Sequence, residues 1–231
     1  MQFTDRELDA VSTASGLAAS LAILSAGLME GTEKELGFFG ALFQEFLSEN
    51  GRILRFACLD LLGAQRASAS STPLRPYLRS TVFHGLLCQR ICHGLWLQDR
   101  VELAMLVHRS SARGSGVRIH PSVDLGYGIV VEEGGTVLVG EGVRVGNNVR
   151  FASGVVVRRS ELEEGSQPPR ISDGASLLGG ARVLGPVTVG AGSTVAPHSV
   201  VLQDVPAYAV VRGNPAVAVG ENRPDPGHAP D

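Results

Sequence analysis

Residues 119–155 read IHPSVDLGYGIVVEEGGTVLVGEGVRVGNNVRFASGV and carry the strongest structural signal in the chain. An aliphatic residue stands at every sixth position here, and the same spacing returns between residues 171 and 201. No α-helix repeats every six residues, whereas a short strand, a corner and another short strand do. The spacing predicts a parallel β-helix of hexapeptides whose aliphatic side chains point into the coil. These positions are Ile119, Leu125, Val131, Val137, Val143, Val149, Val155, Ile171, Leu177, Val183, Val189, Val195 and Val201.

The two runs of hexads are separated by a segment that does not fit the repeat. Val155 and Ile171 lie sixteen residues apart, which is not a multiple of six. Residues 158–170 (RRSELEEGSQPPR) must therefore leave the coil as a loop. Loops that project from a rigid scaffold commonly carry function.

The N-terminal half has a different periodicity. Apolar residues recur at three- and four-residue spacing from residue 4 to about 66 and again from about 77 to 109, which predicts amphipathic helices. We therefore predict an α+β fold, with an N-terminal α-helical domain followed by a left-handed parallel β-helix. The expected domains are a helical oligomerisation domain at 1–116, the β-helix at 117–220 with its extruded loop at 158–170, and a flexible tail at 221–231.

Composition and charge exclude several classes of function. The chain has 20 Lys and Arg against 23 Asp and Glu, so it lacks the basic surface that nucleic acid selects. Serine and glycine dilute the uncharged residues 10–29, and the first ten residues are acidic, so we expect neither a membrane span nor a signal peptide. Cys58, Cys88 and Cys92 lack zinc spacing and are expected to be buried thiols. These features predict a cytoplasmic protein without a metal.

Several motifs resemble the serine acetyltransferases, a family of hexapeptide acyltransferases. The resemblance covers roughly residues 71–220. It includes IHP at 119–121, the segment 128–140, VVLQDVP at 200–206 and GNPA at 213–216. STPL at 71–74 and FHGLLCQRICHGLW at 83–96 resemble the last family helices before the β-helix. The hexads alone indicate only the superfamily of hexapeptide acyltransferases. The helical block followed by IHP narrows the resemblance to the serine acetyltransferases.

The resemblance implies an activity and an assembly. Family members transfer acetyl from acetyl-CoA to serine, and the donor lies in a groove between subunits of a trimer. We therefore expect acetyl-CoA or another acyl-CoA as donor, a small-molecule acceptor, and a homotrimer or a dimer of trimers. The tail ends in Asp231, whereas the family offers a terminal isoleucine to its sulfhydrylase partner. We do not expect that cysteine-synthase complex here.

The catalytic positions of the family are changed in this chain. The family's Asp-His pair, whose histidine is the general base, falls on Glu132 and Glu133. The aspartate that orients the base falls on Arg118, and the second active-site histidine falls on Pro168. The arginine that contacts the serine carboxylate falls on Gln167. Serine acetylation is accordingly expected to be absent or very slow.

Three residues are candidates for catalysis. Glu133 occupies the base position; a glutamate carboxylate titrates near pH 4, which is weak against an alcohol but adequate for an amine. The alternative for Glu133 is a solvated surface acid. Glu132 is its neighbour, and His198 sits at a late corner that could border the donor groove. His120 is expected to have a structural role, because the family keeps this histidine without using it for proton transfer.

The donor site is predicted around the extruded loop and the later coils. Arg158, Arg159 and Arg170 flank the loop, and their guanidinium groups could bind the donor's phosphates. Glu161, Glu163 and Glu164 partly cancel that field. Gly179, Gly180 and Ala196 complete the predicted donor-binding residues.

These observations predict an acyl-CoA-dependent acyltransferase with an acceptor other than serine. An amine or a specialised metabolite would attack the thioester directly. Two alternatives remain open. The chain could be a catalytically degenerate homologue that serves as a scaffold or regulatory partner, or it could transfer an acyl group from or to a carrier protein.

Overall fold

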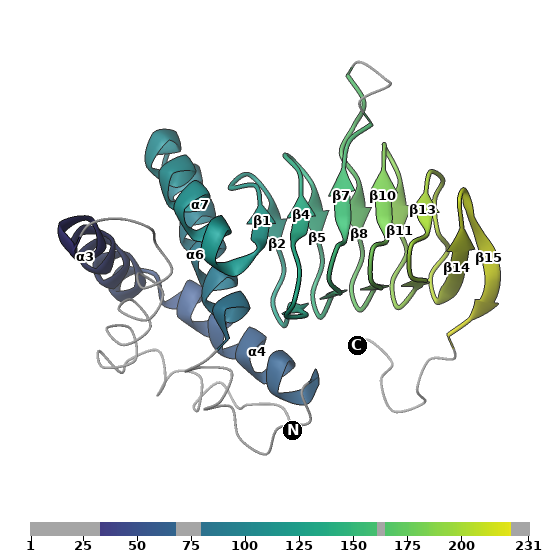
Figure 1. Cartoon of the computed structure of the whole chain (residues 1–231), viewed down its shortest axis with the longest axis horizontal. Coiled ribbons are helices and arrows are strands. Elements are labelled where there is room, and N and C mark those ends of the chain that lie inside the picture. Colours follow the sequence, from purple (N-terminus) through teal and green to yellow (C-terminus); the bar gives the residue numbers. More distant parts are fainter. Residues whose placement is uncertain (1–32, 68–79, 161–164, 223–231) are drawn as a thin grey trace. The chain divides into compact units, whose positions relative to one another are not determined.

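The computed structural model describes residues 33–67, 80–160 and 165–222. Contacts divide the chain into two units, residues 1–121 and 122–231, with helices in the first and short strands in the second (Figure 1). The predicted helix before residue 33 and the predicted tail after residue 222 lie outside the described residues. The domain boundaries predicted at residues 116 and 220 stay predictions.

Four helices are described in the first unit: α3 (Glu33–Glu49), α4 (Gly51–Ala67), α6 (Thr81–Leu97) and α7 (Val101–Ser115). Helix α6 begins after Ser80, whose Oγ accepts a hydrogen bond from the Phe83 backbone N–H at 3.1 Å. This N-cap satisfies one of the backbone donors that a helix start leaves unpaired. Helix α7 ends at Gly116, which adopts a left-handed conformation with φ of 73° that glycine tolerates without a steric cost.

Helix α6 lies at the centre of the helical core and packs against α3, α4 and α7. It is buried on almost every side, because residues 82–92 and Leu95 are all buried. Trp96 is half-buried and packs against this core. The residues of α3, α4 and α7 that form this core together with α6 include Phe39, Phe43, Phe46, Leu47, Leu54, Ala104 and Val107.

The strands of the second unit form three parallel faces of a coil (Figure 1). One face has the order β4-β7-β10-β13, the second β2-β5-β8-β11 and the third β3-β6-β9-β12-β14, with β15 antiparallel to β14 at its end. β1 (Val117–Ile119) belongs to the first unit. The other bounds are β2 (Asp124–Leu125), β3 (Val130–Val131), β4 (Val137–Val139), β5 (Arg144–Val145), β6 (Arg150–Phe151), β7 (Val156–Arg158), β8 (Arg170–Ile171), β9 (Ser176–Leu177), β10 (Arg182–Leu184), β11 (Thr188–Val189), β12 (Thr194–Val195), β13 (Val200–Val201), β14 (Ala209–Gly213) and β15 (Ala216–Glu221).

The hexad residues stack in register inside the coil. In the second face Leu125, Val145, Ile171 and Val189 are successive Cα partners, and each is buried. Of the thirteen hexad positions only Val131 is half-buried rather than buried. Tight corners join the strands: a Cβ added at Gly126 would lie 2.3 Å from the Gly146 carbonyl oxygen. The predicted fold class, a helical domain followed by a left-handed parallel β-helix, is confirmed.

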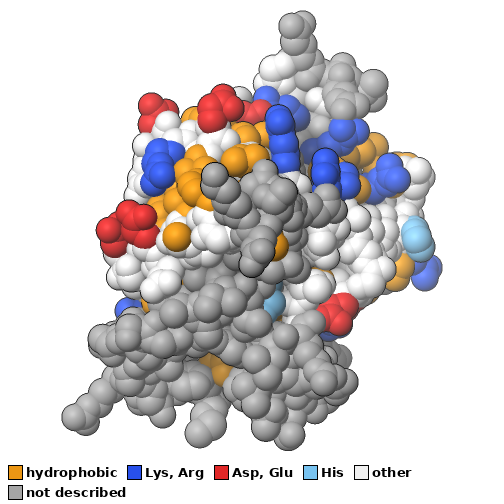
Figure 2. Space-filling view, turned by 60° about the vertical axis from the view of Figure 1, so that its left-hand side comes forward, with side chains coloured by type: hydrophobic (Ala, Val, Ile, Leu, Met, Phe, Trp, Pro, Cys, Tyr) orange, Lys and Arg blue, Asp and Glu red, His pale blue; other side chains and the backbone are white. Residues whose placement is uncertain are grey.

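Two further features of the structure bear on function: a long connection between two strands and the distribution of charge on the surface. Residues 159–169 form a long connection between β7 and β8, of which 161–164 lie outside the described part. The surface carries mixed charge, and several basic side chains gather at the upper right of the face shown in Figure 2.

Candidate active site

The two candidate carboxylates, Glu132 and Glu133, follow β3 at one corner of the coil. Glu132 is half-buried and its Oε1 accepts hydrogen bonds from Nε (3.0 Å) and Nη2 of Arg150, which lies one coil further on. The Glu133 side chain is exposed. The Glu132 carboxylate is therefore held by an ion pair, and Glu133 is the carboxylate at this corner that is open to a substrate.

Four further predicted site residues meet at the same corner in later coils. The His198 backbone N–H donates to the Gly179 carbonyl oxygen at 2.9 Å, which joins two neighbouring coils. A Cβ added at Gly180, where φ is 70°, would lie 2.4 Å from His198 Nδ1. The His198 ring therefore covers the backbone of Gly180. Ala196 is buried two residues before the exposed His198.

Glu133 and His198 are not brought together within one chain. Residues 134–136, 152–154, 178–180 and 196–198 occupy this corner in successive coils, linked by backbone hydrogen bonds from Gly154 to Thr136, from Gly180 to Ser153 and from His198 to Gly179. Three steps of about 4.8 Å separate the first coil from the last, or about 14 Å. His198 therefore cannot share a proton with Glu133 in the same subunit.

A pocket of about 270 Å³ lies at a different corner of the coil. Gly142, Arg144, Gln167, Pro168 and Arg170 line it. Arg159 reaches the same place, because its Nη2 lies 3.7 Å from a Cβ added at Gly142. The structure thus brings together Arg159 and Arg170 from the predicted donor site. It adds Arg144, which the sequence reasoning missed. Arg158 ends β7 and is half-buried.

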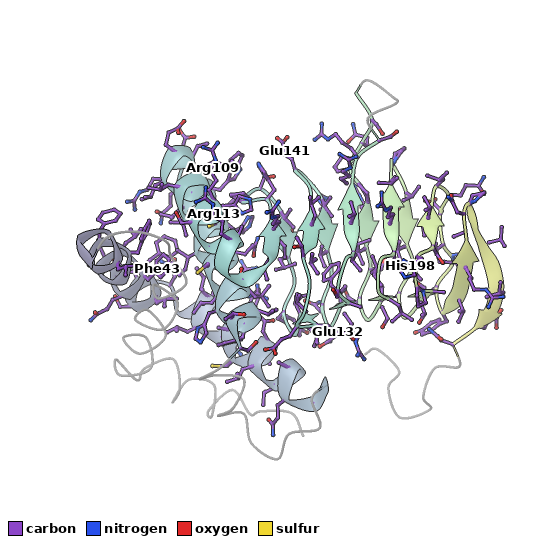
Figure 3. All side chains as sticks on the ribbon, in the orientation of Figure 1. Phe43, Arg109, Arg113, Glu132, Glu141 and His198 are labelled. Carbon is purple, nitrogen blue, oxygen red and sulfur yellow. The ribbon has the colours of Figure 1, made fainter. Side chains whose placement is uncertain are left out.

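The carboxylate corner and the arginine pocket lie apart in one subunit. Figure 3 shows Glu132 at the lower edge of the coil and Glu141, the neighbour of the pocket residue Gly142, at the upper edge. Glu133 and Gln167, the positions predicted from the resemblance to fall on the base and on the substrate arginine, therefore belong to different corners. A single chain does not form a site that contains both.

The remaining histidines of the helical unit have structural contacts. The His120 ring packs edge-on against Trp96, with ring centroids 5.3 Å apart, and lies 6.4 Å from His108. Burial lowers the pKa of His108 below its ordinary 6.5, and the nearby positive charges of His120, Arg109 and Arg118 lower it further. The structural role of His120 stays a prediction.

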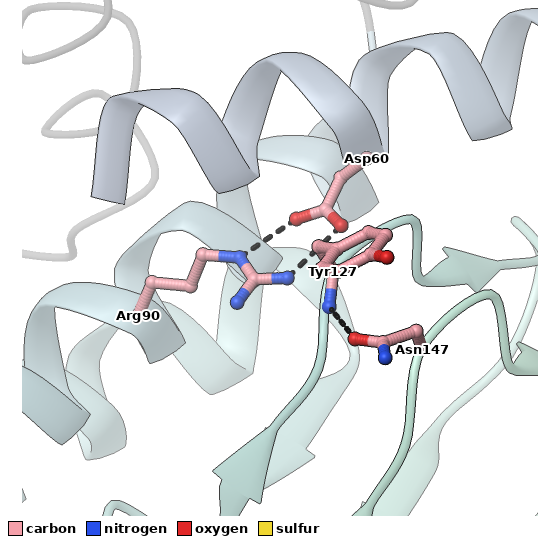
Figure 4. A network of polar contacts seen from close by, with 4 residues as sticks. All are labelled: Asp60, Arg90, Tyr127 and Asn147. Carbon is pink, nitrogen blue, oxygen red and sulfur yellow. Dashed lines mark hydrogen bonds and ion pairs between the residues drawn. The ribbon is translucent and has the colours of Figure 1, made fainter. Parts of the chain in front are cut away.

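The helical unit also contains a buried ion pair, shown in Figure 4. Asp60 accepts hydrogen bonds from Nε and Nη2 of Arg90 at 2.7 and 2.9 Å, and both side chains are almost fully buried. The Arg90 guanidinium also lies 5.1 Å from the centre of the Phe56 ring. These contacts satisfy a charge that would otherwise be costly to bury, so the pair is structural.

Across residues 33–67, 80–160 and 165–222, no group of three or more His, Cys, Asp or Glu side chains could hold a metal ion. No helix in these ranges is long and apolar enough to cross a membrane.

No family model matches the chain. Individual proteins do. The chain is 31% identical over 186 residues to serine acetyltransferase of Haemophilus influenzae, a match that covers 79% of this chain and 68% of the relative. It is 38% identical over 134 residues to serine acetyltransferase 2 of Arabidopsis thaliana, which covers 58% of this chain and 42% of the relative. The chain thus spans less than half the length of the plant protein.

Solved structures agree with these matches. Serine acetyltransferase of Neisseria gonorrhoeae in complex with serine superposes with a TM-score of 0.80 at 28% identity, over 92% of this chain and 94% of that one. Soybean serine acetyltransferase superposes with a TM-score of 0.83 at 28% identity, over 93% of each chain.

These matches correct the prediction of a non-standard acceptor. The proteins similar to this chain are serine acetyltransferases, and one of them was solved with serine bound, so an amine or a specialised metabolite as acceptor is not supported. The prediction rested on side chains at Arg118, Glu133 and Gln167. Differences from the family that are inferred at single side chains do not create a pocket for another acceptor.

Proposed function

Because the chain belongs to the serine acetyltransferase family, we propose that it transfers an acetyl group from acetyl-CoA to the hydroxyl of serine. The observation that carries the proposal is the extent of the similarity to the Haemophilus influenzae enzyme, which covers 79% of this chain at 31% identity. The superposition on a serine-bound family member over 92% of the chain supports it.

In the proposed reaction the serine hydroxyl oxygen attacks the thioester carbonyl carbon of acetyl-CoA. Glu133 takes the hydroxyl proton as the new C–O bond forms. The C–S bond then breaks, and the sulfur of CoA leaves with the electron pair and gains a proton. Glu133 is chosen because its carboxylate is exposed at the corner where the family places its base, whereas Glu132 is paired with Arg150.

The proposed base makes the reaction slow. Loss of an efficient general base typically reduces turnover by a factor of roughly a hundred to ten thousand. Gln167 and Pro168 stand where the family has an arginine and a histidine, so the contact to the serine carboxylate is also weakened. Binding of serine is therefore expected to be weak as well.

The donor is proposed to lie along the corner of Gly179, Gly180 and Ala196. The His198 ring occupies the place that a side chain at Gly180 would take, so His198, and not the Gly180 backbone, would face a bound donor there. Arg158 and Arg159, which precede the extruded loop, are the residues proposed to bind the donor's phosphates.

The active protein is proposed to be a trimer. Support comes from the distance between the carboxylate corner and the arginine pocket, which lie at different corners of one coil. In a trimer, the arginine pocket of one subunit could lie next to the carboxylate corner of its neighbour. Light scattering is expected to give at least three times the mass of one 24.2 kDa chain. The mass of a single chain would contradict the shared site.

A second candidate is a homologue that has lost catalysis and serves as a regulatory partner. The ion pair between Glu132 and Arg150 favours this regulatory candidate, because it engages the carboxylate next to the proposed base Glu133. The cytoplasmic location, the absence of a cysteine-synthase complex and the absence of a metal stay predictions.

Four proteins separate the two candidates: the wild type and the variants Glu133→Gln, Glu132→Gln and His198→Ala. We expect serine-dependent release of CoA to fall at least tenfold in Glu133→Gln, while donor affinity stays nearly constant. Glu132→Gln should have a smaller effect. Full activity in Glu133→Gln with loss in His198→Ala would move the base to His198. No CoA release by any of the four would favour the regulatory candidate.

A further inference from the structure

The arginine pocket contains more positive charge than the proposed reaction uses. Arg144 in β5 and Arg170 in β8 are Cα partners on neighbouring strands, which lie about 4.8 Å apart in a sheet. Both side chains are exposed on the outer face and line the pocket. The Arg159 guanidinium lies beside Gly142 and extends the charge to three cations.

Within residues 33–67, 80–160 and 165–222, neither Arg144 nor Arg170 forms an ion pair. Asp124 is the Cα partner of Arg144 on its other side, yet the two side chains are not paired. Like charges on neighbouring strands repel, so the arrangement lowers the stability of the coil unless an anion binds.

The space between the cations is kept open by the backbone. Gly142 adopts φ of 72°, and a Cβ there would lie 3.2 Å from Pro168 Cγ. Any larger residue would therefore be strained and would crowd the pocket. Gln167 adds an amide donor to the same wall. Among the described residues the acidic neighbour is Glu141, which is exposed, while Glu161, Glu163 and Glu164 of the extruded loop lie outside the described residues.

We infer that Arg144, Arg159, Arg170 and Gln167 form a binding site for a phosphate group. A planar carboxylate has two oxygens and one charge, and one guanidinium can satisfy it with two parallel hydrogen bonds. A phosphate carries up to two charges and offers at least three oxygens, which matches three guanidinium forks and an amide. The phosphate belongs either to CoA or to a free anion. The inference goes beyond the proposed function, although the phosphate would share Gln167 with the proposed contact to the serine carboxylate.

The test is calorimetric titration of the full chain with inorganic phosphate, with acetate as the carboxylate comparison. The variants are Arg144→Gln and Arg170→Gln, and the control is Arg182→Gln, which removes an exposed arginine of β10 on another face. Losing one charge-assisted hydrogen-bond pair is expected to weaken phosphate binding about tenfold or more. The control should bind phosphate like the wild type, and acetate should bind more weakly than phosphate.

CoA and dephospho-CoA identify the source of the phosphate. If the site takes the 3′-phosphate of CoA, the wild type prefers CoA, and both pocket variants lose this preference. If it takes a free anion, the two donors bind equally and phosphate does not compete with them. Either result supports the site. Equal phosphate affinity in the wild type and both pocket variants, or no phosphate binding and no preference for CoA, would overturn it. Phosphate binding without serine turnover would refute only the proposed function.

Discussion

Removing the carboxylate of Asp60 should strongly destabilise the helical unit. Asp60 and Arg90 share two hydrogen bonds of 2.7 and 2.9 Å, and their side chains are only 2% and 5% exposed. Asp60→Ala leaves the Arg90 guanidinium buried without its counter-charge. Breaking a buried pair in this way typically costs about 3–5 kcal/mol. The same chain offers a control, because the pair of Glu132 and Arg150 is 36% and 46% exposed. Glu132→Gln should therefore cost about 0–1 kcal/mol.

The assay is urea unfolding followed by two signals. Trp96, the single tryptophan of the chain, lies in α6 and reports the helical unit, while the far-ultraviolet circular dichroism of the strands reports the coil. Asp60→Ala should lower the Trp96 midpoint much more than Glu132→Gln lowers the coil midpoint. The double variant Asp60→Leu, Arg90→Met should recover most of the loss, because it removes both charges. Equal, small effects of the two single variants would refute the argument from burial.

Three other predictions concern stability and reactivity. Gly180→Ala should cost about 1–2 kcal/mol because of its positive φ, with further crowding of His198; Gly179→Ala, whose added Cβ meets only the Ser153 carbonyl oxygen at 3.6 Å, is the control in the same urea titration. Because the pKa of His108 is lowered by burial, the folded protein takes up this proton less readily than the unfolded chain. Stability should therefore be complete above about pH 6.5 and should fall as the pH drops below it; His108→Gln should flatten this part of the curve, and an unchanged slope would contradict the assignment. Burial raises the pKa of the Cys88 thiol to about 12 and that of Cys58 to about 11, and it also raises the pKa of Cys92. A thiol reagent at pH 8 should label Cys88 and Cys92 only after unfolding, and rapid labelling of these two residues in the native protein would refute their burial. Cys58, which was expected to be buried, is only half-buried.

The repeat predicted the coil because each hexad residue is set by a local rule: an aliphatic side chain must fill the interior at each strand. Val131 shows the limit of that rule, since its side chain is only half-buried. The pair of Glu132 and Arg150 was missed although it was predictable. The two residues lie 18 positions apart, which is one coil of three hexads.

The arginine pocket could not be predicted in the same way. The extra residues between β7 and β8 break the count of six, so the spacing of Arg144 and Arg170 does not indicate that they are strand neighbours. Asp60 and Arg90 lie on different helices, and the helix periodicity does not fix how two helices pack. The acceptor was mispredicted for a related reason, because single side chains showed what differs from the family and not what binds instead.

One rate measurement decides whether this chain acetylates serine from acetyl-CoA. The most direct measurement is the initial rate of CoA release by the wild-type protein with and without serine, together with detection of the acetylated product. We expect a serine-dependent rate that is roughly a hundred to ten thousand times below that of a family member with a histidine base. CoA release that does not depend on serine, or no acetylated serine at saturating acetyl-CoA, would contradict the claim.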